Sequence, residues 1–260
     1  MAMRAALGID AAWTVRNPSG VALAVDEGDG WRLVMAAPSY AAFHAQACQA
    51  GACQAGTGLM PDAAALLASA RSLCGAAVDL VAIDMPLAHA PITGRRASDN
   101  LVSREYGARK AGVHSPSAER PGPLSDGLRA GFAELGYGLC TTAFHGLGLI
   151  EVYPHPALIE LTGLPLRLPY KAGKTLTYWP GLDRATRVSR LLDTWGMIVD
   201  TLEAALPGAG AALPLPAVPT KAFEDMLDAV VCALVAARTL DGRARALGDA
   251  ASAIWVPLPG

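Results

Sequence analysis

The chain has 260 residues, of which 52% are hydrophobic and only 17% charged, a composition that excludes a disordered protein and supports a sizeable core. Its net charge of −2 gives no overall attraction to nucleic acids or anionic membranes, so any polyanion contact needs a local basic patch. The five cysteines are scattered without a CxxC pair, which argues against a disulfide framework or a zinc site. With no leader or membrane-spanning segment evident, we expect a soluble, cytoplasmic protein.

The first third of the chain shows the sequence pattern of β-strands. Apolar alternation predicts strands over residues 5–9, 20–25 and 31–36, with the turn DEGDG joining the last two. A small loop rich in Gln, Ala and Gly (QACQAGACQAG) follows, and helical spacing then predicts a helix over 61–73. The continuous apolar run over 78–83 is typical of a strand that is buried on both faces.

The second part is interrupted by Gly, Pro, Ser and Arg from 88 to 147, which predicts a long insertion with one helix over 99–111. A strand over 148–152 and a helix over 154–161 follow.

The remainder alternates helices with loops. Long helices are predicted over 182–206 and 220–240, separated by a linker-like stretch, and a last strand over 254–258. This order predicts a single α/β domain over 1–260: a mixed sheet, with three antiparallel-connected strands followed by parallel ones, flanked by helices.

Carboxylates recur where the pattern indicates the interior. Asp10 ends the first strand, Asp84 follows the fourth, and Glu151 lies in GLIEVYPHP. Asp225 and Asp228 share one face of a helix that is apolar nearly all round. Taken alone, an acid at a strand end is explained by a role in capping a helix or forming a turn, and Asp225 is explained by a solvent-exposed position in the first turn of its helix. Together the acids repel one another unless a cation lies among them, and oxygen ligands suit Mg²⁺ or Mn²⁺.

Several of these motifs resemble a known family. The segments GIDAAW, AIDMPL, EVYPHPAL and EDMLDAVVCALVAA, followed by IWVP, look like the DUF429 family, regarded as predicted nucleases of the RNase H-like superfamily. The segment GRRASDNLVSREYG also resembles the family's Arg- and Asp-bearing segment, here Arg95, Asp99 and Arg104. The resemblance covers essentially the whole chain and implies an RNase H-like fold.

The resemblance also implies a mechanism and a set of site residues. RuvC-type resolvases carry a similar Asp-x-x-Asp-Ala helix, which Asp225, Asp228 and Ala229 match. Asp10, Asp84, Asp225 and Asp228 would then hold two divalent ions, Mg²⁺ or Mn²⁺, for hydrolysis of phosphodiester bonds in DNA or RNA. Glu151 fits the DUF429 pattern as a further catalytic acid but has no general superfamily counterpart, and Asp84 stands where many relatives carry Glu.

Two local basic patches fit a nucleic-acid partner. Between residues 165 and 190, six cations face one acid, and PYKAGKTLTYWPG interleaves Lys171 and Lys174 with aromatic residues that could contact phosphates and stack on bases. Arg95 and Arg104 belong to the second patch. Ordinary solvation of a basic loop and helix face explains the first patch equally well, and Asp99 and Glu105 partly offset the second. His155, between two prolines, fits a proton-transfer role or a structural turn.

Two other functions remain open. GIDAAWTVRNPSG could face nucleotide phosphates in an actin-like phosphotransferase or ATPase. Such enzymes usually duplicate this core and carry a second glycine-rich loop, and AGKT is no phosphate loop because Leu168 occupies the required glycine position. Alternatively, a catalytically silent binding module keeps the acids as a structural network, although burying so many carboxylates without a cation is unfavourable.

Overall fold

The computed structural model describes residues 3–14, 16–49 and 61–259. Its strands form one mixed sheet in the order β3-β2-β1-β4-β6-β8-β7, with the short β5 paired to β6. β1, β2 and β3 pair antiparallel, and β1, β4, β6 and β8 run parallel. The strands span Arg4–Asp10 (β1), Gly20–Asp26 (β2), Trp31–Ala37 (β3), Leu80–Ile83 (β4), Gly138–Leu139 (β5), Gly148–Val152 (β6), Ala244–Gly248 (β7) and Ala253–Pro257 (β8). The predicted mixed sheet is confirmed.

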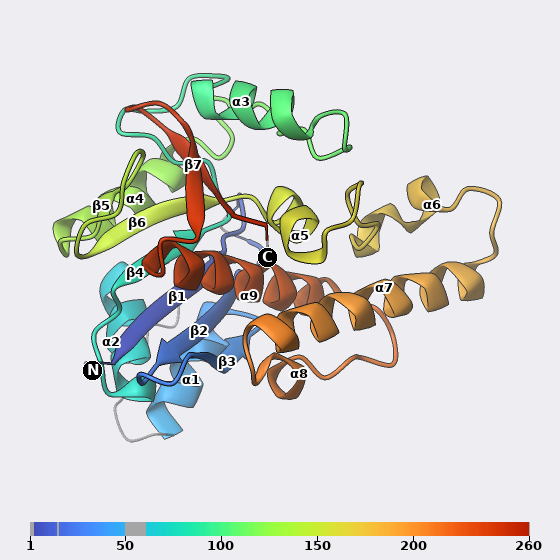
Figure 1. Cartoon of the computed structure of the whole chain (residues 1–260), viewed down its shortest axis with the longest axis horizontal. Helices are drawn as coiled ribbons and strands as arrows, with labels where there is room; N and C mark the ends of the chain where they lie inside the picture. The colour runs from blue at the N-terminus through green and yellow to red at the C-terminus, as the bar shows by residue number, and fades with distance from the viewer. Residues whose placement is uncertain (1–2, 15, 50–60, 260) are drawn as a thin grey trace.

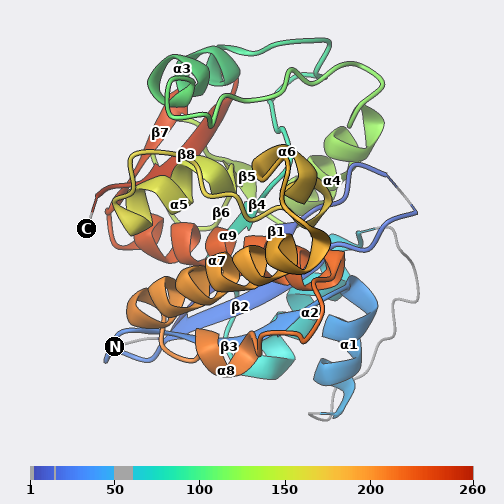
Figure 2. The ribbon, with the colours of Figure 1, turned by 90° about the vertical axis from the view of Figure 1, so that its right-hand side faces the viewer.

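Helices cover both faces of this sheet (Figures 1 and 2). They span Tyr40–Gln49 (α1), Ala63–Cys74 (α2), Ala97–Tyr106 (α3), Pro123–Glu134 (α4), Pro154–Thr162 (α5), Thr175–Tyr178 (α6), Arg184–Ala205 (α7), Ala209–Ala212 (α8) and Lys221–Leu240 (α9), with the 3-10 turn η1 at Ala172–Lys174. Among the described residues, no helix is long and apolar enough to cross a membrane.

Alternate residues of the strands build two cores. Ala6 and Leu80 pack under α9, α7 and α5, whereas Leu7 and Val81 pack against α1, α2 and α4. A smaller cluster joins α3 to β7 and β8, and both views show α3 beside β7 (Figures 1 and 2). The helix α9 is apolar nearly all round because the sheet covers one side and α7 and α5 pack on others.

Differences from the expected elements have local causes. The predicted Gln/Ala/Gly loop begins inside α1, which buries Phe43 and His44, and its residues 50–56 lie outside the described part. The helix α4 lies in the expected insertion because Leu128 and Phe132 reach the second core. The predicted linker contains α8, and the edge strand β7 escapes detection because its sequence, ARALG, does not alternate clearly.

Candidate metal centre

The first two acids come from adjacent parallel strands. Asp10 is the last residue of β1, and Asp84 directly follows β4. Ile9 and Ile83 are register partners, and the backbone N–H of Asp84 donates to the carbonyl of Ile9 at 2.8 Å. Because the carboxyl ends of parallel strands meet at one edge of a sheet, the two carboxylates share that edge.

The third acid comes from α9, which lies unusually close to the sheet. A Cβ at Gly8 would lie 2.1 Å from the carbonyl oxygen of Ala229, and one at Gly20 would lie 2.1 Å from that of Asp225. Glycine at these two strand positions therefore permits the close approach of the helix backbone. Thr220 caps the start of α9, because its hydroxyl accepts a hydrogen bond from the N–H of Phe223 at 3.2 Å.

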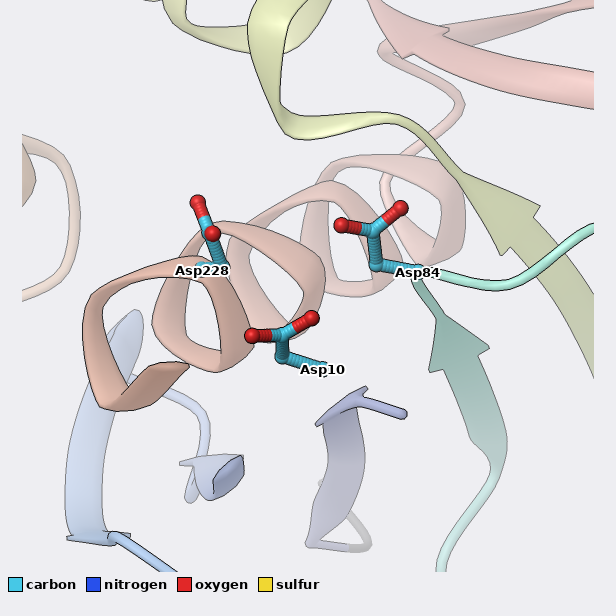
Figure 3. Close-up of side chains that lie close together, drawn as sticks. All are labelled: Asp10, Asp84 and Asp228. Carbon is cyan, nitrogen blue, oxygen red and sulfur yellow. The ribbon is translucent and has the colours of Figure 1, made fainter. Parts of the chain in front are cut away.

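These elements bring three carboxylates together. Asp10, Asp84 and Asp228 each offer an oxygen that lies within 4.8 Å of the others (Figure 3). Asp228 is fully buried, and the other two are half-buried. No described residue donates a hydrogen bond to the side chain of Asp10 or Asp84. Carboxylate oxygens suit a hard divalent cation, and two of these three side chains have no partner of their own among the described residues, so the cluster can hold a metal ion.

The cluster also holds protons more tightly than ordinary carboxylates do. Burial, followed by the charges of Asp228 and Asp84, raises the pKa of Asp10 well above its usual range. Burial and the charge of Asp228 raise the pKa of Asp84 to about 8. Burial also raises the pKa of Asp228, although Lys171 opposes the shift. A bound cation would favour the ionised forms of all three acids.

Asp228 is oriented by partners from the segment before η1. The hydroxyl of Tyr170 donates to one of its oxygens at 2.7 Å, and the ammonium of Lys171 donates to the other. The same ammonium lies 3.4 Å from Glu224. Burial works to lower the pKa of Lys171, but the charges of its acidic neighbours, Asp228 first among them, together outweigh burial and raise it. Lys171, expected as a substrate contact, thus lies inside the acidic cluster as a fixed positive charge.

The other two predicted acids pair with cations of the chain. Asp225 lies one helical turn before Asp228 and forms an ion pair with Lys221, outside the group of three. Glu151 is buried and accepts two hydrogen bonds from Arg96, at 2.5 and 2.7 Å, and one from the N–H of Leu87 at 2.7 Å. Burial raises the pKa of Glu151, and Arg96 opposes the shift.

Arg96 joins β6 to the start of α3. Its guanidinium also binds Asp99 at 2.6 Å, and the Asp99 carboxylate accepts from the backbone N–H of Arg96 at 2.9 Å. Both residues are buried, so this network fixes the segment after β4 against the sheet. The Arg-x-x-Asp spacing at a helix start indicates the pairing of Arg96 with Asp99. Nothing in the sequence indicates that Glu151 also binds Arg96.

The remaining predicted substrate residues lie apart from the cluster. Arg95 binds Asn100 and Ser103, at 2.7 and 2.6 Å, and so braces the loop around α3. Arg104 is exposed on α3, and Lys174 is exposed at the end of η1. His155 is buried with an unpartnered Nδ1, and its ring lies edge-on to Tyr170 at 5.1 Å, which supports a packing role.

A cleft gives access to the acids. It has a volume of about 530 Å³ and is lined by Asp10, Asp84 and Asp225 together with two cations, Arg120 and Lys221. The guanidinium of Arg120 lies 5.9 Å from the centre of the Trp13 ring, at the same cleft. Sequence reasoning missed Arg120 and Trp13 because the insertion brings Arg120 to the site only through the fold.

Comparison with known protein families gives a match over part of the chain. Residues 140–252 match the family model described as "Protein of unknown function (DUF429)". No curated protein and no solved structure matches the chain. The matched segment contains β6, Lys171 and α9, and it ends within the turn before β8. The similarity to the DUF429 family therefore covers the part of the fold that contributes Asp228 to the cluster.

Proposed function

We propose that this protein is a divalent-metal-dependent nuclease that hydrolyses phosphodiester bonds of DNA or RNA. The observation that carries the proposal is the convergence of Asp10, Asp84 and Asp228, whose oxygens lie within 4.8 Å of one another beside an open cleft. The DUF429 match and a sheet order compatible with an RNase H-like fold support it. The ion pairs of Glu151 and Asp225 would suit a silent module with a structural acid network, but they leave Asp10 and Asp84 without a partner among the described residues.

The chain's own residues have distinct tasks in this proposal. The three aspartates hold Mg²⁺ or Mn²⁺, and Tyr170 and Lys171 keep the Asp228 carboxylate in one orientation. The chemistry that such ions supply when bound is a lowered pKa for an attacking water and stabilisation of the departing oxygen. A second ion would draw on Asp225, which lines the same cleft, after its release from Lys221.

Positive charge at the cleft favours a polyanionic substrate. Arg120 and Lys221 line the same cleft as the acids, although the chain as a whole has a net charge of −2. Lys221 is paired with Glu224 and Asp225, whereas Arg120 is exposed and forms no ion pair among the described residues. Arg120 can therefore offset the repulsion of a phosphodiester by the acids, and we assign it to phosphate binding.

Cleavage assays test the proposal. The purified protein is incubated with labelled single-stranded, duplex and branched DNA and RNA in the presence of Mg²⁺ or Mn²⁺. We expect strand cutting that falls by about 100-fold or more in both Asp10→Asn and Asp228→Asn. Asp193→Asn, which removes an exposed carboxylate from α7, is the matched control and should cut normally.

Other outcomes of the same assay contradict the proposal. Hydrolysis of nucleotides without strand cutting would identify an ATPase. Absence of both activities, together with no metal-dependent rise in melting temperature, would identify a binding module.

A further inference from the structure

A second groove lies beside the metal centre and is lined by cations and aromatic rings. Its volume is about 460 Å³, and its lining includes Lys110, Arg167, Lys174, Tyr178 and Trp179. None of the residues that line it is acidic. The ion pairs found among the described residues include none from Lys110, Arg167 or Lys174. The groove therefore presents three positive charges that the chain does not neutralise.

We propose that this groove binds one nucleotide unit of a single-stranded nucleic acid, next to the bond that the metal centre hydrolyses. The cations of the groove bind the phosphate, and the base stacks on its aromatic rings. This inference rests on the proposed nuclease function, because it assigns the substrate class and the path of the strand.

Arg167 is held in a position suited to an anion. Its backbone N–H donates to the carbonyl of Arg109 at 2.9 Å, and its guanidinium donates to the hydroxyl of Tyr178 at 3.0 Å. The buried Nε of Arg167 has no hydrogen-bond partner among the described residues. The side chain is thus fixed by neutral groups, and its charge remains available for a phosphate.

The two aromatic side chains are partly exposed and both line the groove. The rings of Tyr178 and Trp179 lie 5.7 Å apart at 72°, so they meet edge to face and do not stack on one another. Trp179 also packs partly against the core, which fixes its position. Stacking on an aromatic ring requires an unpaired base, so the groove favours a single strand over a duplex.

The groove and the metal centre are joined by one turn of backbone. Lys171, at the start of η1, contacts Asp228, and Lys174, at its end, lines the groove. The N–H of Lys174 donates to the carbonyl of Lys171 at 3.0 Å, which closes this turn. Three residues of 3-10 helix advance about 6 Å, so a strand held in the groove has its neighbouring phosphate near the carboxylates.

The test is binding without catalysis. Fluorescence anisotropy measures the affinity of the full chain for a short labelled single-stranded oligonucleotide, as DNA and as RNA, in buffer with EDTA. We expect Trp179→Leu to weaken binding by about tenfold through lost stacking. Lys174→Ala should reduce the slope of log affinity against log salt by about 0.7, as expected for one lost phosphate contact. Arg71→Ala, which removes an exposed arginine from α2 outside the groove, is the charge-matched control and should change affinity less than about twofold.

Each result decides the inference. Tenfold loss in Trp179→Leu with a normal melting temperature, a smaller salt slope in Lys174→Ala and an unchanged control support it. Normal binding by both groove variants, an equal loss in Arg71→Ala, or a duplex that binds as tightly as the single strand would overturn it. Binding as described by a protein that cuts nothing would refute only the nuclease proposal, and cutting with normal binding by the groove variants would refute only the groove.

Discussion

Replacing Asp84 by Asn is expected to stabilise the metal-free protein. In the absence of a cation, burial and the charge of Asp228 raise the pKa of Asp84 to about 8, whereas an unfolded aspartate titrates near 3.8. Because pH 7 lies roughly three pH units above the unfolded pKa, and each unit corresponds to about 1.4 kcal/mol, this pKa difference lowers the free energy of unfolding by about 4 kcal/mol at most. Asp84 is half-buried and partly screened by water, so we expect a gain of about 1–3 kcal/mol.

Urea unfolding at pH 7 measures this effect, with wild type and Asp84→Asn compared in EDTA and in Mn²⁺. Wild type should gain about 2.7 kcal/mol at a Mn²⁺ concentration of about 100 times Kd, and the variant should gain much less. A conserved m-value is required for the comparison. Lower stability of Asp84→Asn in EDTA would refute the reasoning, because it would mean that partners within the chain already satisfy the carboxylate.

Three further predictions test other parts of the structure. The metal-free protein should lose stability as the pH rises from about 5 to 8, because Asp84 keeps a proton in the folded state that it has released in the unfolded state. Urea midpoints measured across this range should change less for Asp84→Asn than for wild type. Arg96→Met leaves the buried Glu151 without its cation and should lower the free energy of unfolding by about 3–5 kcal/mol; an unchanged urea midpoint would contradict the assignment of this ion pair. Gly8→Ala places a methyl group against the Ala229 carbonyl and should displace α9, so the melting temperature should no longer rise with Mn²⁺. A rise equal to that of wild type would show that the close approach of α9 is not required.

Local patterns were sufficient to predict most of the sheet. The strands β1, β2, β4 and β6 are nearly continuous runs of buried apolar residues, and α9 is apolar on almost every side because it packs against the sheet. The strand β7 was missed because it lies at the edge, where residues such as Arg245 face solvent and leave no alternation to detect. The helix α4 depends on long-range packing of Phe132, which local spacing does not reveal.

The same distinction applies to the candidate site. The convergence of Asp10 and Asp84 could be predicted because the carboxyl ends of parallel strands lie at one edge of a sheet. Asp228 could be identified as a site residue because an ionised side chain on a buried helix needs a cation or a hydrogen-bond partner. The pairing of Asp225 with Lys221 follows from residues four apart on one helix. By contrast, Glu151 meets its arginine only across the fold, so its local sequence is the same whether it binds a metal or closes an ion pair.

The central claim is that Asp10, Asp84 and Asp228 converge to hold a divalent cation. Anomalous diffraction from crystals grown with Mn²⁺ tests it most directly. The account predicts a peak at about 2.0–2.2 Å from oxygens of all three carboxylates, with Lys171 still bound to Asp228. A peak elsewhere on the chain, or none among these three side chains at saturating Mn²⁺, would contradict it.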